Sequence, residues 1–138
     1  MPAIGETTNL TLEDAAALVR DRRVMPAELT EACLARIEAV EPRLNAFVTV
    51  TAEVARTQAR EAGDEIAAGR YRGPLHGIPV AVKDLFATRG IRTTAGSRIL
   101  ADWIPDEDAT VVGRLREAGA VLLGKLGLCD RRLPSAVS

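Results

Sequence analysis

The sequence predicts an α/β fold, with a mixed or parallel sheet that helices flank on both faces. Short apolar runs typical of buried strands alternate with longer segments of helical periodicity, and strands separated by helices favour this architecture. The 138 residues, 47% of them hydrophobic, are enough to form the core of one domain. Only 3% are aromatic, so Ala, Val, Leu and Ile must do most of the packing.

The first half of the chain predicts two helices and a strand. Thr11 suits the N-cap of a helix that runs to about Asp21. Pro26 suits the first turn of a second helix, and Pro42 is expected to stop it. Residues 46–50 read as a strand. The second helix carries an apolar stripe of Leu29, Cys33, Leu34 and Ile37.

The second half predicts two more helices, each followed by a strand. A third helix is expected over residues 52–68, with Gly69 after its end. Residues 80–82 then predict a short strand buried on both faces. Asp108 is expected to cap a fourth helix that runs to Ala118 and leads, through Gly119, into a buried strand at 120–123.

Lys83 is the candidate catalytic residue, because it directly follows the apolar run at 80–82 and is expected to enter the interior. Lysine is among the side chains least often buried, since removing its ammonium from water is costly. Desolvation favours the neutral amine, which makes a buried lysine a candidate general base. From the residue types alone, the favoured interpretation is a structural lysine that pairs with Asp84 or extends to water.

Composition and charge exclude several classes of function. Eighteen basic and nineteen acidic residues leave a net charge of −1, which gives no electrostatic reason to bind nucleic acid directly or an anionic membrane. Cys33 and Cys129 are too few for a disulfide framework, and with one histidine we expect no metal and no cofactor. Cys33, on an apolar helix face, is interpreted as a core residue. No run approaches the length of a membrane span, so the expected location is cytoplasmic.

Three further features have a functional and a structural interpretation. Residues 119–125 match the phosphate-loop pattern G-x-x-x-x-G-K, but Leu126 follows where Ser or Thr is required, and a strand-end Lys125 is favoured. His76 is interpreted as a hydrogen-bonded turn residue. The polar segment 93–97 could line a substrate pocket or could satisfy backbone groups of its own loop, and the sequence favours neither.

Several ordered motifs together resemble the amidase signature family. The resemblance extends from about residue 10 to residue 128, and so many motifs in the right order are a specific signal. The motifs are Glu28-Leu29-Thr30, Arg36-Ile37-Glu38, Leu44-Asn45-Ala46-Phe47-Val48, Gly73 to Asp84, Thr93 to Ser97, Asp108 to Val112 and Gly119 to Lys125.

The resemblance implies the N-terminal portion of the amidase signature fold, incomplete here, and an enzyme that uses two serines and a lysine. Lys83 matches that lysine. The family's serines belong to a glycine- and serine-rich segment downstream, and the chain's own serines, Ser97, Ser135 and Ser138, lack that context. We therefore expect residues 1–128 to be the N-terminal part of an amidase domain. Residues 129–138 are expected to be an irregular tail, encoded out of frame or ended by a premature stop.

The function that the resemblance implies is hydrolysis of amide bonds in small-molecule substrates, with this chain inactive by itself. One alternative is a fragment of the A subunit of a glutamyl- or aspartyl-tRNA amidotransferase. Another is a non-catalytic module that binds a partner. Strands at 80–82 and 120–123 with uncovered edges and faces would favour self-association.

Overall fold

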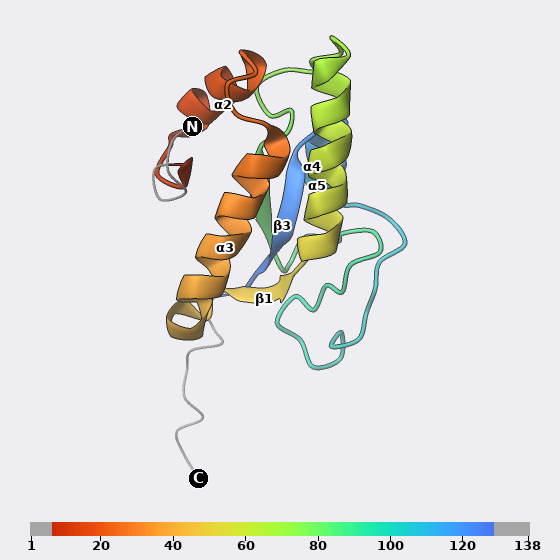
Figure 1. The fold of residues 1–138 in the computed structure, drawn as a ribbon. Helices are drawn as coiled ribbons and strands as arrows, with labels where there is room; N and C mark the ends of the chain where they lie inside the picture. Colours follow the sequence, from red (N-terminus) through yellow and green to blue (C-terminus); the bar gives the residue numbers. More distant parts are fainter. Residues whose placement is uncertain (1–6, 129–138) are drawn as a thin grey trace.

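The computed structural model describes residues 7–128 (Figure 1). The predicted tail 129–138, with Cys129, Ser135 and Ser138, lies outside the described residues. Along the chain the elements are α2 (Leu12–Arg20), α3 (Pro26–Leu44), β1 (Phe47–Val50), α4 (Ala52–Ala67), β2 (Pro79–Lys83), α5 (Thr110–Glu117) and β3 (Val121–Leu126).

The sheet is mixed and has the strand order β1-β3-β2. The central strand β3 runs antiparallel to β1 and parallel to β2. Helices α3 and α4 lie side by side over one face, and α5 lies behind the sheet (Figure 1). The predicted α/β class and the mixed sheet flanked by helices are therefore confirmed.

The core is divided between the two faces of β3, because alternate side chains of a strand point in opposite directions. Val121 and Leu123 pack against α3 and α4, whereas Leu122 packs against Val82 of β2 and Val112 of α5. A separate cluster joins α2 to the rest of the domain. Its buried members are Ala15, Val19, Val24, Leu29, Ile66 and Ile78.

The helix boundaries confirm most of the predicted signals. Thr11 caps α2, its hydroxyl oxygen accepting a hydrogen bond from Asp14 N at 3.1 Å. The predicted stop at Pro42 is wrong, because α3 continues to Leu44 and ends at Asn45 in the left-handed conformation. Proline has no N–H, so Pro42 leaves the Glu38 carbonyl without its helical hydrogen bond. Glu38 is exposed in the last turns of the helix, and its carbonyl can bond to water instead.

The expected cap at Asp108 is also wrong. Helix α5 begins at Thr110 with Ala109 at the N-cap. The Asp108 carboxylate instead accepts hydrogen bonds from Arg89 N at 2.7 Å and from Arg116 Nε at 2.6 Å. Asp108 therefore ties the loop after β2 to α5, a long-range role that local sequence signals do not reveal.

Strand β2 is less buried than its apolar sequence predicts. Only Val82 of this strand is buried, and the residues before it are half-buried. Among residues 7–128, β2 pairs on one side only, with β3. No helix within this described range is long and apolar enough to cross a membrane.

Candidate active site

Lys83 lies at the carboxyl end of β2, where its side chain is exposed. Its Nζ donates a hydrogen bond to Gly127 O at 3.1 Å. The expectation that Lys83 enters the interior is therefore wrong in this chain. The reason is positional: Lys83 is the last residue of an edge strand, and its side chain extends past the end of the sheet instead of into the core.

The buried lysine is Lys125, which is 0% exposed although the sequence favoured a simple strand-end position. Lys125 lies inside β3, which extends beyond the predicted 120–123 to Leu126. It pairs in register with Val82, the residue before Lys83. The two lysines of the chain thus occupy adjacent places on neighbouring parallel strands.

The Lys125 ammonium uses all three of its N–H donors within the protein. Nζ donates to Phe86 O at 2.7 Å and to the hydroxyl oxygens of Thr88 and Thr93 at 2.8 Å each. Its Nζ also lies 4.0 Å from the carboxylate of Asp84, which is 1% exposed. A buried cation is therefore surrounded by three neutral oxygens and one anion.

Asp84 holds the segment that follows the β2 loop. Its carboxylate accepts hydrogen bonds from Thr94 N at 3.2 Å and from the Thr94 hydroxyl. Its backbone O accepts a hydrogen bond from Ala95 N at 2.8 Å, and its own N–H donates to Leu126 O at 2.8 Å. Asp84 therefore connects the end of β2 both to β3 and to the loop at residues 93–97.

Burial lowers the pKa of Lys125, because removing the ammonium from water disfavours its charged form. The Asp84 carboxylate opposes this effect, and Asp108 opposes it further. We expect such a closely bonded cation to hold its surroundings in one arrangement, since each hydroxyl that it contacts is itself bonded to a backbone carbonyl. Thr88 donates to Phe86 O and Thr93 to Ile91 O, each at 3.0 Å.

The hydroxyls of segment 93–97 bond to groups of the protein itself, as the structural interpretation of this segment expects. Thr93 and Thr94 are buried, and their hydroxyls bond to groups of this same network. Ser97 N donates to Thr94 O at 2.8 Å, which closes a tight turn. The central residues of that turn, Ala95 and Gly96, both have positive φ. Ser97 Oγ accepts a hydrogen bond from Ile99 N at 3.2 Å, so this hydroxyl also serves its own loop.

The phosphate-loop interpretation of residues 119–125 is excluded by the backbone. Gly124 and Lys125 lie within β3 instead of in a loop before a helix. Gly124 is required for another reason, because a Cβ there would lie 2.3 Å from Thr49 O on β1.

His76 is a buried residue of the turn before β2, as predicted. Its Nδ1 accepts a hydrogen bond from Arg72 N at 3.0 Å, and its Nε2 lies 3.2 Å from the Glu65 carboxylate. Burial lowers the pKa of His76, while Glu65 opposes that shift. Cys33 packs at the edge of the cluster between α3 and β3, and burial raises the pKa of its thiol. This confirms its predicted packing role.

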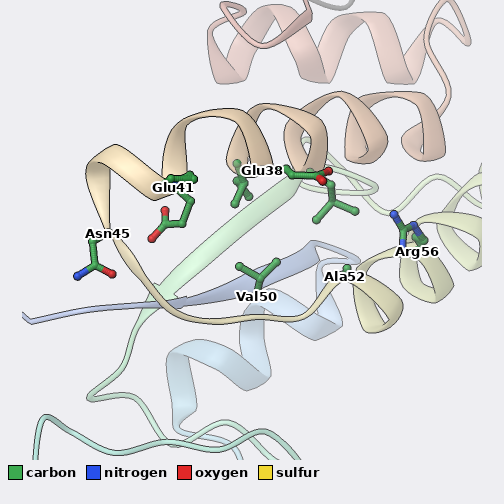
Figure 2. A pocket seen from close by; sticks show the side chains of 9 residues that line it. Glu38, Glu41, Asn45, Val50, Ala52 and Arg56 are labelled. Atoms are coloured by element: carbon green, nitrogen blue, oxygen red, sulfur yellow. The ribbon is translucent and has the colours of Figure 1, made fainter.

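A cavity of about 730 Å³ opens between α3, β1 and the start of α4 (Figure 2). Two of its polar side chains have partners within the protein: Glu41 accepts a hydrogen bond from Phe47 N, and Arg56 pairs with Glu31 and Glu53. Lys83 is not among its lining residues. The cavity is therefore separate from the candidate site at Lys83.

Sequence reasoning missed the network around Lys125 and Asp84. The signal that could have found it is the rarity of lysine, since Lys83 and Lys125 are the only lysines among eighteen basic residues. No group of His, Cys, Asp and Glu within residues 7–128 could hold a metal ion.

Comparison with known proteins identifies the family and the fold. The family model "Amidase" matches residues 28–132. Over 121 residues the chain is 53% identical to the A subunit of the glutamyl-tRNA(Gln) amidotransferase of Geobacter sulfurreducens, covering 88% of this chain and 25% of that protein. The fold matches the peptide amidase of Stenotrophomonas maltophilia with a TM-score of 0.81 and 41% identity, over 87% of this chain and 25% of that one.

A fatty acid amide hydrolase, 22% identical, shares the fold with a TM-score of 0.86 over 91% of this chain and 22% of that one. The chain spans about a quarter of the length of the curated relatives that it matches. The match of the family model over most of the sequence shows that the chain belongs to the amidase family.

Proposed function

We propose that this chain supplies the lysine of an amidase site that cleaves carbon–nitrogen amide bonds with two serines and a lysine, and that Lys83 is this lysine. The observation that carries the proposal is the placement of Lys83. Its exposed amine extends from the carboxyl end of β2, and ligands of α/β sheets bind at the carboxyl ends of the strands. The turn that follows Lys83 is held by the buried network around Lys125.

Lys83 would act in proton transfer. An unprotonated lysine amine can accept a proton from one serine, which in turn activates a second serine to attack the amide carbonyl. Backbone N–H groups beside the nucleophile would stabilise the developing oxyanion. The 138 residues contain no glycine- and serine-rich segment to provide these groups, so a second set of residues would have to supply them.

Residues 1–128 would then form the N-terminal part of an amidase domain acting on a small-molecule amide in the cytoplasm, without direct contact to nucleic acid or membrane. The level of identity favours a component of the amidotransferase type. Identity is 53% to the A subunit of the glutamyl-tRNA(Gln) amidotransferase, against 41% to the peptide amidase. The competing hypothesis is a module that binds a partner without catalysis.

Two chimeras test the proposal. In each, residues 1–128 replace the matching N-terminal quarter of a relative, either the peptide amidase or the A subunit of the amidotransferase. Amide hydrolysis is then measured for the native sequence and for Lys83→Ala. We expect turnover in at least one chimera, and a loss of at least about 10²-fold in Lys83→Ala, the lower limit for general acid–base catalysis.

Arg98→Ala is the matched control, because Arg98 is an exposed cation on the loop after β2 that lies outside the lysine network. It should retain the rate of the native sequence. A Lys83→Ala chimera with near-normal turnover would show that Lys83 is only structural. Two folded chimeras without any turnover would favour the non-catalytic module.

A further inference from the structure

Lys83 on β2 and Lys125 on the parallel strand β3 are offset from each other by one residue in the strand pairing. Val82 pairs with Lys125, and Lys83 pairs with Leu126. One amine is exposed at the end of the sheet, and the other is buried beneath the loop that follows β2.

Every other basic residue of this chain is arginine, which makes the two lysines informative. Arginine is a planar fork that does not lose its proton in proteins, whereas lysine is a compact ammonium with three rotatable donors. The Lys125 site fits the second geometry, with three acceptors within 2.7–2.8 Å of one nitrogen. No single nitrogen of a guanidinium has three N–H donors, so arginine could not reproduce these contacts.

The contacts of Lys125 lead directly to Lys83. Lys125 holds Phe86 O, and Phe86 N donates to Lys83 O at 3.1 Å. On the other side of Lys83, the backbone of Asp84 bonds to Leu126 O and to Ala95 N at 2.8 Å each. The turn that begins at Lys83 is thus held by the bond from Lys125 to Phe86 O and by the bond from Asp84 N to Leu126 O of β3.

Strand β2 needs this support, because it is an edge strand within the described residues. Its backbone bonds to β3 on one side only, and no helix packs over the exposed side chain of Lys83. Without the bond from Lys125 to Phe86 O, the turn after Lys83 would lose its contact to the buried side and could open locally.

We propose that Lys125, held by Thr88 and Thr93 and bonded to Phe86 O, is a positioning residue that sets the orientation of Lys83. This inference rests on the proposed role of Lys83 in amide cleavage. Lys125 is fully buried and would touch neither substrate nor the reacting atoms. Its loss should therefore change how well Lys83 works, and leave substrate binding unchanged.

Amide hydrogen exchange on the 138-residue chain tests whether Lys125 orders the turn after Lys83. The variants are Lys125→Met and the milder Thr93→Val, which removes one hydroxyl at nearly constant volume. We expect protection of the amides of Asp84, Phe86 and Ala95 to fall about tenfold more than protection of the buried amides of α4, as in a local opening.

Thr93→Ser, which keeps the hydroxyl, should retain protection close to that of the native chain, and Thr57→Val is a matched exchange on an exposed helix face. If Lys125→Met does not fold, the comparison of Thr93→Val with Thr93→Ser tests the proposal. Equal loss of protection at the β2 turn and in α4, or no loss at either, would overturn the proposal, because Lys125 would then contribute only to global stability or to nothing measurable.

Enzyme kinetics on an active chimera tests whether Lys125 affects catalysis by Lys83. Thr93→Val and Lys125→Met should lower kcat by about tenfold or more with KM unchanged, since only proton transfer by Lys83 is affected. Changes in KM alone, or an unchanged kcat, would overturn the positioning role. If neither chimera is active, the proposed function fails, while the exchange experiment still decides whether Lys125 orders the Lys83 turn.

Discussion

Gly119 lies so close to the imidazole of His76 that any side chain at position 119 would have to displace the ring. A Cβ at position 119 would lie 2.4 Å from His76 Cδ2, and Gly119 has a φ of +81°. In addition, Gly119 O accepts a hydrogen bond from Gly77 N at 2.9 Å. The end of α5 is therefore packed directly on the turn that leads into β2.

We expect Gly119→Ala to lower the free energy of unfolding by about 3 kcal/mol. The positive φ disfavours alanine by about 1 kcal/mol, and displacing the buried ring adds the cost of overpacking, about 1–3 kcal/mol. Urea unfolding followed by circular dichroism measures the difference.

Gly69→Ala separates these two costs. Gly69 has the same φ of +81°, but a Cβ there would have no neighbour within 4 Å. Its substitution should cost only about 1 kcal/mol. Equal losses at the two positions would mean that contact with His76 contributes nothing.

The stability of the chain should decrease as the pH falls below about 6.5, the ordinary pKa of histidine. Burial lowers the pKa of His76 in the folded state, and Glu65 opposes the shift while Arg72 supports it. The unfolded chain therefore binds the proton first. Stability is complete above the unfolded-state pKa and is lost as the pH falls toward the folded-state value, with a slope of at most about 1.4 kcal/mol per pH unit.

His76 is the only histidine of the chain, which makes the assignment direct. Other charged or ionisable groups around it are Tyr71, Glu61 and Arg116. In His76→Asn the side-chain oxygen can still accept from Arg72 N, so the variant should fold but lose this pH dependence. Urea titrations from pH 5 to pH 8 compare the two, and an unchanged slope in His76→Asn would assign the effect to carboxylates.

The sequence was sufficient to predict elements that depend on local signals. Thr11 as a cap, the end of α4 before Gly69 and the order of strands and helices all follow from short-range preferences. The error at Pro42 is of the same local kind, because a proline in the last helical turn costs only one hydrogen bond.

The candidate site was predicted less completely, since its geometry depends on distant residues. Lys83 was found from its motif, but its exposure depends on which strand forms the edge of the sheet. Asp108 bonds to Arg89, nineteen positions away, and Lys125 bonds to threonines more than thirty positions before it. Local patterns carry no information about such pairs.

The ion pair of Lys125 and Asp84 should be strongly coupled energetically. Breaking a buried pair leaves one uncompensated charge, at a cost of about 3–5 kcal/mol. We expect Lys125→Met and Asp84→Asn each to destabilise the chain by about this amount. The double variant should lose less than the sum of the two, by at least about 1 kcal/mol in a double-mutant cycle.

An exposed ion pair is the control for this double-mutant cycle. Arg20 and Asp21 form an exposed pair at 3.1 Å, and solvent screening leaves such surface pairs with little effect on stability. Arg20→Met and Asp21→Asn should therefore be nearly neutral and additive. If the buried pair is also additive, then Lys125 and Asp84 act independently, and the threonine contacts alone hold the ammonium.

Self-association of this chain should depend on the loop after β2 more than on the strands. The predicted exposure of the 120–123 strand is wrong, because β3 is central and buried on both faces. The exposed apolar side chains of this region instead lie on the loop, where Ile99 is 94% and Ile104 60% exposed. Exposed apolar groups of this kind, with a net charge of only −1, favour association.

We expect the chain to bind a hydrophobic dye and to sediment as oligomers at concentrations on the order of micromolar, and the double substitution of Ile99 and Ile104 by serine to reduce both effects. Leu12→Ser on α2, where Leu12 is 55% exposed, is the matched control and should change neither. Sedimentation velocity and dye fluorescence measure the two effects. A native chain that sediments as a compact monomer without dye binding would contradict the prediction and favour a stand-alone module, and oligomers that persist in the double variant would place the contact at the open edge of β1 or β2.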